Sequence, residues 1–120
     1  MISSLLLRVS TVLLLLGMLW GISMGIRADF TLAPAHAHLN LVGFVLMFLV
    51  GLYYRIVPAA GAALLAKIQA ALHIIGAIVF PIGIAQVLLG GSEAFTIFGS
   101  LIVLAAMGLF AWIVFRTAPA

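Results

Sequence analysis

Two histidines, His36 and His38, stand one residue apart at the start of an apolar stretch, in the sequence PAHAHLN of residues 34–40. Imidazole is a common protein ligand of transition metals and the usual axial ligand of haem iron. An ionisable side chain inside an apolar segment is energetically expensive, so its presence there indicates a function. This histidine pair is therefore the strongest chemical signal in the chain.

The spacing of the pair constrains what it can bind. Residues at i and i+2 of an α-helix point about 200° apart around the helix axis. His36 and His38 therefore cannot hold one metal from a regular helix, for which a spacing of three or four residues is needed. The spacing predicts two sites, one on each side of the helix. The alternative is that both side chains only meet water and lipid headgroups at a helix end.

The third histidine, His73, lies in the next apolar segment, at a depth that differs from that of His38 by on the order of 10 Å. We therefore expect it to form a hydrogen bond inside the bundle. Asn40 is a candidate hydrogen-bond partner of a ligand histidine, or a bridge between helices. Arg27 is a candidate partner for an anionic cofactor group, with a headgroup anchor or a local pair with Asp29 as the alternatives.

The composition predicts an all-α integral membrane protein. The 120 residues are 68% hydrophobic and 6% charged, with a mean hydropathy of +1.48. This length allows about four membrane spans, and we expect one four-helix up-down bundle over residues 1–120. The expected helices cover about residues 5–26, 34–57, 62–89 and 94–117, and we expect the first to be retained as a helix. Cysteine is absent, which excludes disulfides and thiolate ligands.

The basic residues indicate an orientation in the membrane. Four of them fall on one side of the expected bundle: Arg8, Arg55, Lys67 and Arg116. Arg27 and both acids fall on the other side. The positive-inside rule then predicts cytoplasmic N and C termini, with the histidine pair toward the outer face. We expect the membrane to be a bacterial inner membrane. Scattered charges of this kind do not indicate nucleic acid as a partner.

Glycines recur at every fourth position of the first segment, at Gly17, Gly21 and Gly25. They form a flat face that allows close helix packing, or alternatively a groove for a flat cofactor. Pro81 predicts a bend in the third helix.

Residues 34–44, with the sequence PAHAHLNLVGF, continue to Gly51-Leu52-Tyr53-Tyr54 and Pro58. This segment, about a quarter of the chain, resembles the tenth transmembrane helix of subunit I in the haem–copper oxidase and nitric oxide reductase superfamily. The resemblance implies that His36 occupies a high-spin haem position and His38 a low-spin haem position. It also implies haem b as the cofactor, and a redox partner or quinol.

The chain also departs from that family. Subunit I has about twelve helices in three groups of four, whereas four are expected here. The sequence has no adjacent histidine pair and no His-x-x-x-Tyr, so nothing indicates a copper site or oxygen reduction. By analogy with the family, three copies would imitate the twelve-helix subunit. Each haem would then lie between His36 of one protomer and His38 of its neighbour.

The sequence thus predicts a membrane haem b protein for electron transfer or gas-ligand binding. Any enzymatic activity would be of the oxidoreductase kind. Two alternatives remain: a non-enzymatic structural or assembly subunit, and a copper-binding protein that uses histidines of several protomers. Both acids lie in expected loops and no nucleophile–base pair is present, which argues against a hydrolase or a transferase.

Overall fold

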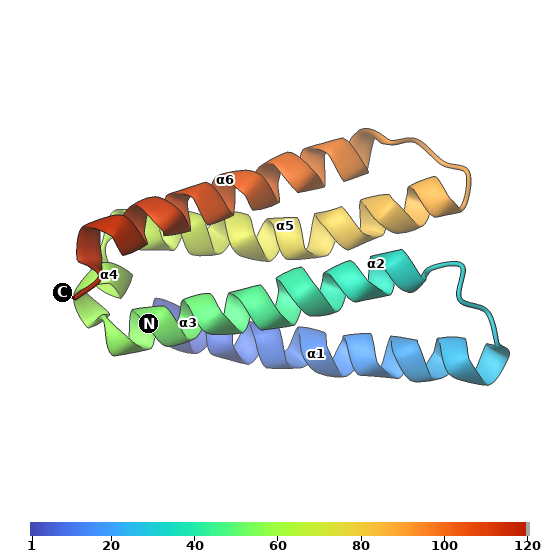
Figure 1. Ribbon diagram of the computed structural model, residues 1–120, viewed down its shortest axis with the longest axis horizontal. Coiled ribbons are helices and arrows are strands. Elements are labelled where there is room, and N and C mark those ends of the chain that lie inside the picture. The colour runs from blue at the N-terminus through green and yellow to red at the C-terminus, as the bar shows by residue number, and fades with distance from the viewer. Residues whose placement is uncertain (120) are drawn as a thin grey trace.

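The computed structural model describes residues 1–119, and it contains only helices (Figure 1). The elements are α1 (Ile2–Arg27), α2 (Ala33–His38), η1 (Leu39–Leu46), α3 (Met47–Ile56), α4 (Pro58–Ala62), α5 (Leu64–Leu88) and α6 (Ala94–Thr117). Because α2, η1 and α3 follow one another without a break, they form one rod, Ala33–Ile56. This rod and the helices α1, α5 and α6 are each long and apolar enough to cross a membrane, which confirms the prediction of four spans.

The helices form two hairpins that lie side by side (Figure 1). In the first hairpin, α1 packs along η1 and α3; in the second, α5 packs along α6. The hairpins meet where α5 lies against α2 and η1, and α6 packs chiefly on α5. The whole molecule measures 48 × 27 × 22 Å, with all four spans along its longest axis.

The second span differs from the regular helix that the sequence predicts, because residues Leu39–Leu46 form a π-helix. A π-helix bonds residue i to i+5 instead of i+4; such segments are rare and are frequently found at functional sites. The segment begins directly after His38, so it sets the rotation of the histidine pair relative to α3. Hydropathy does not reveal such a segment, since its residues are as apolar as those of an α-helix.

The break after the second span also differs from expectation. Val57 leaves the helical conformation, with φ −116° and ψ 76°, and a separate short helix, α4, begins at Pro58. Proline is suited to a first helical turn because it has no N–H to leave unpaired. The third span therefore begins at Leu64 rather than at residue 62.

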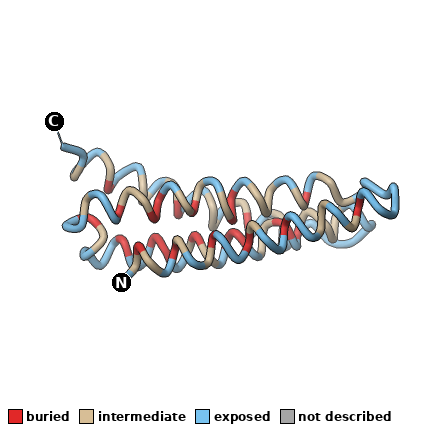
Figure 2. The backbone as a smooth tube through the Cα atoms, turned by 90° about the horizontal axis from the view of Figure 1, so that it is seen from below, coloured by how far each residue is buried: buried red, intermediate tan, exposed pale blue. Residues whose placement is uncertain are grey.

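The core is built largely from small side chains at the helix contacts. The buried positions lie along the seams between helices (Figure 2). In the contact between α5 and α6, a Cβ at Gly83 would collide with the backbone of Thr96, and a Cβ at Gly99 would lie 2.6 Å from the Cα of Phe80. These glycines let the two backbones approach closely, as small residues do in membrane helix pairs. Large apolar side chains cover the outside instead, which suits contact with lipid.

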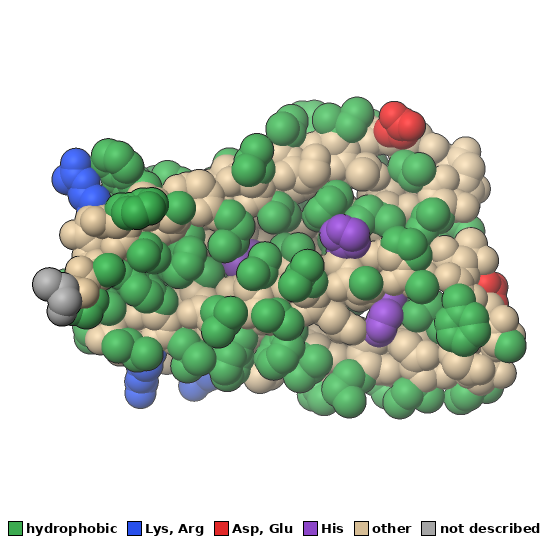
Figure 3. All heavy atoms as spheres, viewed as in Figure 1, with side chains coloured by type: hydrophobic (Ala, Val, Ile, Leu, Met, Phe, Trp, Pro, Cys, Tyr) green, Lys and Arg blue, Asp and Glu red, His purple; other side chains and the backbone are tan. Residues whose placement is uncertain are grey.

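On the face that Figure 3 shows, basic side chains lie toward one end of the molecule and acidic side chains toward the other. Arg8, Arg55, Lys67 and Arg116 lie toward the end that holds α4, which we call the basic end. Asp29 and Glu93 lie in the two turns at the opposite end.

Candidate functional site

His36 faces the first helix of its own chain. Its ring lies edge-on to Trp20, with 6.0 Å between the ring centroids and an angle of 83° between the planes. A Cβ built on Gly21 would come within 3.0 Å of the His36 Cε1 atom. Glycine at position 21 leaves room for the imidazole, and a larger residue there would have to displace the ring slightly.

His38 faces the other hairpin. Its ring lies edge-on to Phe80 of α5, with 5.0 Å between the ring centroids and an angle of 75° between the planes. The two histidines thus contact opposite neighbours, α1 and α5, as the spacing of two residues predicted. Figure 3 shows histidine side chains at the surface among apolar ones, and both His36 and His38 are half-buried.

The backbone of its own helix orients His38. Its Nδ1 atom lies 2.7 Å from the carbonyl oxygen of Pro34. A carbonyl only accepts hydrogen bonds, so Nδ1 donates, and Nε2 of the neutral ring carries the free lone pair. Histidines that bind metals are commonly held in this way, because the hydrogen bond fixes both the tautomer and the ring orientation.

Asn40 bonds His36, as one of its two sequence interpretations predicted. The amide nitrogen Nδ2 lies 3.3 Å from His36 Nε2. The amide nitrogen only donates, so Nε2 accepts and the proton of the neutral ring lies on Nδ1. That Nδ1 and the Asn40 Oδ1 are buried without a hydrogen-bond partner among the described residues. Asn40 Oδ1 lies against Gly17, where a Cβ would collide with it.

His73 is fully buried and belongs to a chain of hydrogen bonds, here called the buried network. Its Nε2 donates to the carbonyl oxygen of Val42 in η1 over 3.0 Å, and its Nδ1 accepts from the amide nitrogen of Gln69 over 3.4 Å. Gln69 Oε1 in turn accepts from the Tyr54 hydroxyl over 3.1 Å. This confirms the predicted hydrogen bond of His73 inside the bundle. Both ring nitrogens are occupied, which leaves neither free to bind a metal.

Gln69 and Tyr54 have a place in this network that the sequence interpretation missed. A signal was present, because Gln69 and His73 are four residues apart and so share one helix face. Tyr54 is almost completely buried, with only 2% of its surface exposed.

Arg27 lies at the exposed end of α1 opposite the basic end. Its guanidinium bonds its own helix, with Nη2 2.6 Å from Ser23 Oγ and Nε 3.4 Å from the Ser23 carbonyl oxygen. The nearby Asp29 carboxylate accepts from the hydroxyl and the backbone N–H of Thr31, over 2.7 and 3.1 Å. These two hydrogen bonds, with a smaller contribution from the charge of Arg27, hold the pKa of Asp29 below its ordinary value.

Residues 1–119 contain no group of three or more His, Cys, Asp or Glu side chains placed to hold a metal ion together. No protein-family model, curated protein or solved structure matches this chain. The histidine pair offers single imidazoles on opposite sides of one helix.

Proposed function

We propose that this protein binds haem b in the membrane through the histidine pair, as a single four-helix relative of haem–copper oxidase subunit I. The observation that carries the proposal is the state of His38. Its Nδ1 donates a hydrogen bond to the Pro34 carbonyl, which fixes the direction of the Nε2 lone pair. Among residues 1–119, His38 belongs to no group of side chains that could hold a metal ion together. One imidazole from each side is what axial ligation of haem iron needs.

The two histidines fit this role unequally. His38 is ready to bind, because only its Nδ1 is used within the chain. His36 Nε2 accepts from Asn40, and the ring fills the space beside Gly21. Binding of iron at His36 therefore requires the Asn40 amide to turn away from Nε2. The amide would then be free to bond the His36 atom that lacks a partner, Nδ1, or to face Gly17.

Haem in such a site supplies one-electron chemistry, or gas-ligand binding where one axial position stays open. The residues of this chain would bind and shield it. Phe80 and Trp20 lie edge-on to the two imidazoles and restrict water there. Arg27 lies at the same end of the molecule and would pair with a propionate after releasing Ser23.

The second axial ligand would come from another copy of the chain. His36 and His38 diverge, and His73 uses both of its nitrogens within the buried network. A ring of protomers, with three favoured by the family analogy, would bring His36 of one copy toward His38 of the next. The distribution of basic residues supports cytoplasmic termini in a bacterial inner membrane. A quinol or a protein redox partner would then exchange electrons with the haem.

The test is the reduced-minus-oxidised optical spectrum of the detergent-purified protein. We expect a haem b α-band that His38→Ala abolishes and His36→Ala weakens or shifts. His73→Gln serves as the control, since it removes a histidine outside the pair. A protein that stays colourless after haem reconstitution contradicts the proposal, and a fully loaded monomer contradicts the ring.

One observation favours a second candidate, a structural or assembly subunit without cofactor. His36 already makes close contacts within its own chain, to Trp20, Gly21 and Asn40. In that case His36→Ala loosens the contact between α1 and α2, and no spectrum changes. The third candidate, copper shared between protomers, predicts that the colourless protein retains copper and loses it in His38→Ala.

A further inference from the structure

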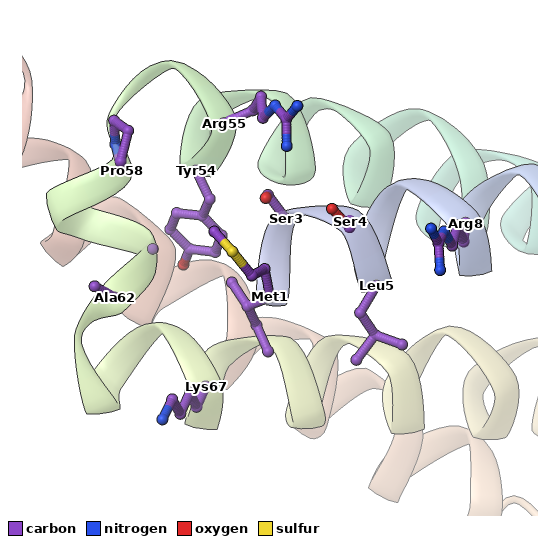
Figure 4. Close-up of a pocket in the computed structure, with 12 residues that line it drawn as sticks. Met1, Ser3, Ser4, Leu5, Arg8, Tyr54, Arg55, Pro58, Ala62 and Lys67 are labelled. Carbon is purple, nitrogen blue, oxygen red and sulfur yellow. The ribbon is translucent and has the colours of Figure 1, made fainter.

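A pocket of about 880 Å³ opens at the basic end of the molecule (Figure 4). Its walls come from four elements: the first turns of α1, the end of α3, α4 and the start of α5. The pocket is far from the histidine pair along the long axis, because α2 begins at the opposite end of the molecule. Nothing in the proposed haem site uses it.

The charged side chains that line this pocket are all basic. Arg8, Arg55 and Lys67 line it, each from a different helix, and all three side chains are exposed (Figure 4). The two carboxylate side chains of the protein, Asp29 and Glu93, lie at the other end (Figure 3). The three positive charges therefore attract an anion without competition from an acidic side chain. The hydroxyl groups of Ser3 and Ser4 line the same pocket.

The rest of the lining is apolar, which narrows the chemistry of the ligand. Ile2, Leu5 and Pro58 are part of the wall, and Leu5 is 46% exposed. The volume corresponds to about thirty water molecules, so a phosphate ion would occupy only a small part of it. A molecule with an anionic group and an adjoining hydrocarbon chain matches both parts of the lining.

The floor of the pocket is closed. Tyr54 lines it, but the Tyr54 hydroxyl is bonded to Gln69 and the side chain is 2% exposed. A ligand in the pocket therefore does not reach the buried network through Tyr54. The basic residues of the pocket lie near the ends of the membrane spans. An anionic group bound by them therefore lies near the membrane surface, at the level where a phospholipid carries its phosphate.

We propose that this pocket binds the headgroup of an anionic phospholipid. Arg8, Arg55 and Lys67 lie apart around the pocket and attract the phosphate and the charged headgroup from different sides (Figure 4), and the acyl chain runs along Leu5 and the apolar surface beside it. Basic pockets between membrane helices are known to hold anionic lipid headgroups, and exposed basic residues gain from the surface potential of such lipids.

The test measures lipid binding by the intact protein in phosphatidylcholine nanodiscs, with fluorescently labelled phosphatidylglycerol as the probe. We expect the probe to bind more tightly than labelled phosphatidylcholine. The triple variant Arg8→Gln, Arg55→Gln, Lys67→Gln should weaken binding about a hundredfold, since each basic residue near an anionic surface contributes roughly fivefold. All three side chains are exposed, so the variant is expected to fold, and circular dichroism checks this.

Arg116→Gln is the matched control. Arg116 lies at the same end and carries the same charge, but it stands over the Trp112 ring at 4.7 Å and does not line the pocket. Its removal should leave lipid binding unchanged. Equal losses in the control and in the single variant Arg8→Gln would mean diffuse surface attraction and would overturn the proposal. So would equal binding of phosphatidylcholine, or displacement of the probe by inorganic phosphate at millimolar concentration, which would indicate a soluble phosphate site.

Discussion

Replacing His73 by leucine tests whether the buried network holds the two hairpins together. Leucine is similar in size to histidine but has no polar atoms. The change removes the hydrogen bond to the Val42 carbonyl, which joins α5 to η1, and the bond from Gln69 within α5. We expect a less stable protein whose helices remain intact, because the helical backbone bonds are local.

The size of the effect follows from the two bonds and the groups left behind. A side-chain hydrogen bond between membrane helices contributes about 0.6 kcal/mol on average, and one between residues i and i+4 of the same helix contributes about 0.2–0.5 kcal/mol. The two bonds of His73 together therefore contribute about 1 kcal/mol. The Gln69 amide and the Val42 carbonyl then stay buried without their partner, and such a group costs about 1–3 kcal/mol where it finds no other. We therefore expect the free energy of unfolding to fall by about 1 kcal/mol if both groups find other partners, and by up to about 3 kcal/mol if one of them does not.

The assay is reversible unfolding in mixed dodecyl maltoside and sodium dodecyl sulfate micelles, followed by the fluorescence of Trp20 and Trp112. Ile75→Ala is the control on the same helix, since this side chain is 48% exposed on the lipid-facing side. It should change stability by less than about 0.5 kcal/mol. The double variant Gln69→Leu, His73→Leu should be more stable than the sum of the single effects predicts, because the two residues share one bond.

Two results would refute this reasoning. If His73→Leu unfolds at the same detergent fraction as the unchanged protein, the network contributes no stability. If the effects of Gln69→Leu and His73→Leu simply add, the two side chains act independently and the 3.4 Å contact is not a stabilising bond.

Two further predictions concern the half of the molecule that holds the histidine pair. Gly17→Ala should shift Asn40, whose Oδ1 would collide with the new Cβ, and should lower the free energy of unfolding by about 1–3 kcal/mol. Gly25→Ala is the control and should not lower it, because nothing lies within 4 Å of a Cβ at that position. Equal effects of the two variants in the same unfolding assay would show that the Gly17 contact is not tight. The hydrogen bonds of Thr31 stabilise the ionised Asp29 carboxylate and hold its pKa below the ordinary value of 3.8. Their contribution to the stability of the folded protein is therefore present above pH 3.8 and is lost as the pH falls through the lowered pKa of Asp29 in the folded protein. Thr31→Ala should therefore raise the pKa of Asp29 in a carboxyl-carbon NMR titration, and an unchanged titration would show that Thr31 does not hold the carboxylate.

The features that the sequence predicted correctly depend on local geometry or on hydropathy. Four apolar segments predict four spans because the bilayer sets their length. The opposite directions of His36 and His38 follow from helical periodicity alone. The hydrogen bond of His73 was predictable because a buried imidazole in an apolar helix needs a partner.

The features that the sequence did not predict depend on contacts between helices. The π-helical segment in the second span has no distinctive composition. The choice of Val42 as the partner of His73 depends on how α5 lies against η1. The tight fit of Asn40 against Gly17 requires knowing which face of α1 meets α2. The glycine face was visible in the sequence, but the side chains that it receives were not.

The arrangement in two hairpins has a consequence for how the protein is made. Side-chain hydrogen bonds cross between the hairpins from Tyr53 to Thr117, from Tyr54 to Gln69 and from His73 to the Val42 carbonyl. Each hairpin leaves and re-enters the same side of the membrane, so each can insert as a unit during synthesis. His36 and its neighbours belong entirely to the first hairpin, whereas the surroundings of His38 include Phe80 of the second. The contacts on the two faces of α2 therefore form at different times. The contacts with α1 form first, and those with α5 form only after the last two spans have entered the bilayer.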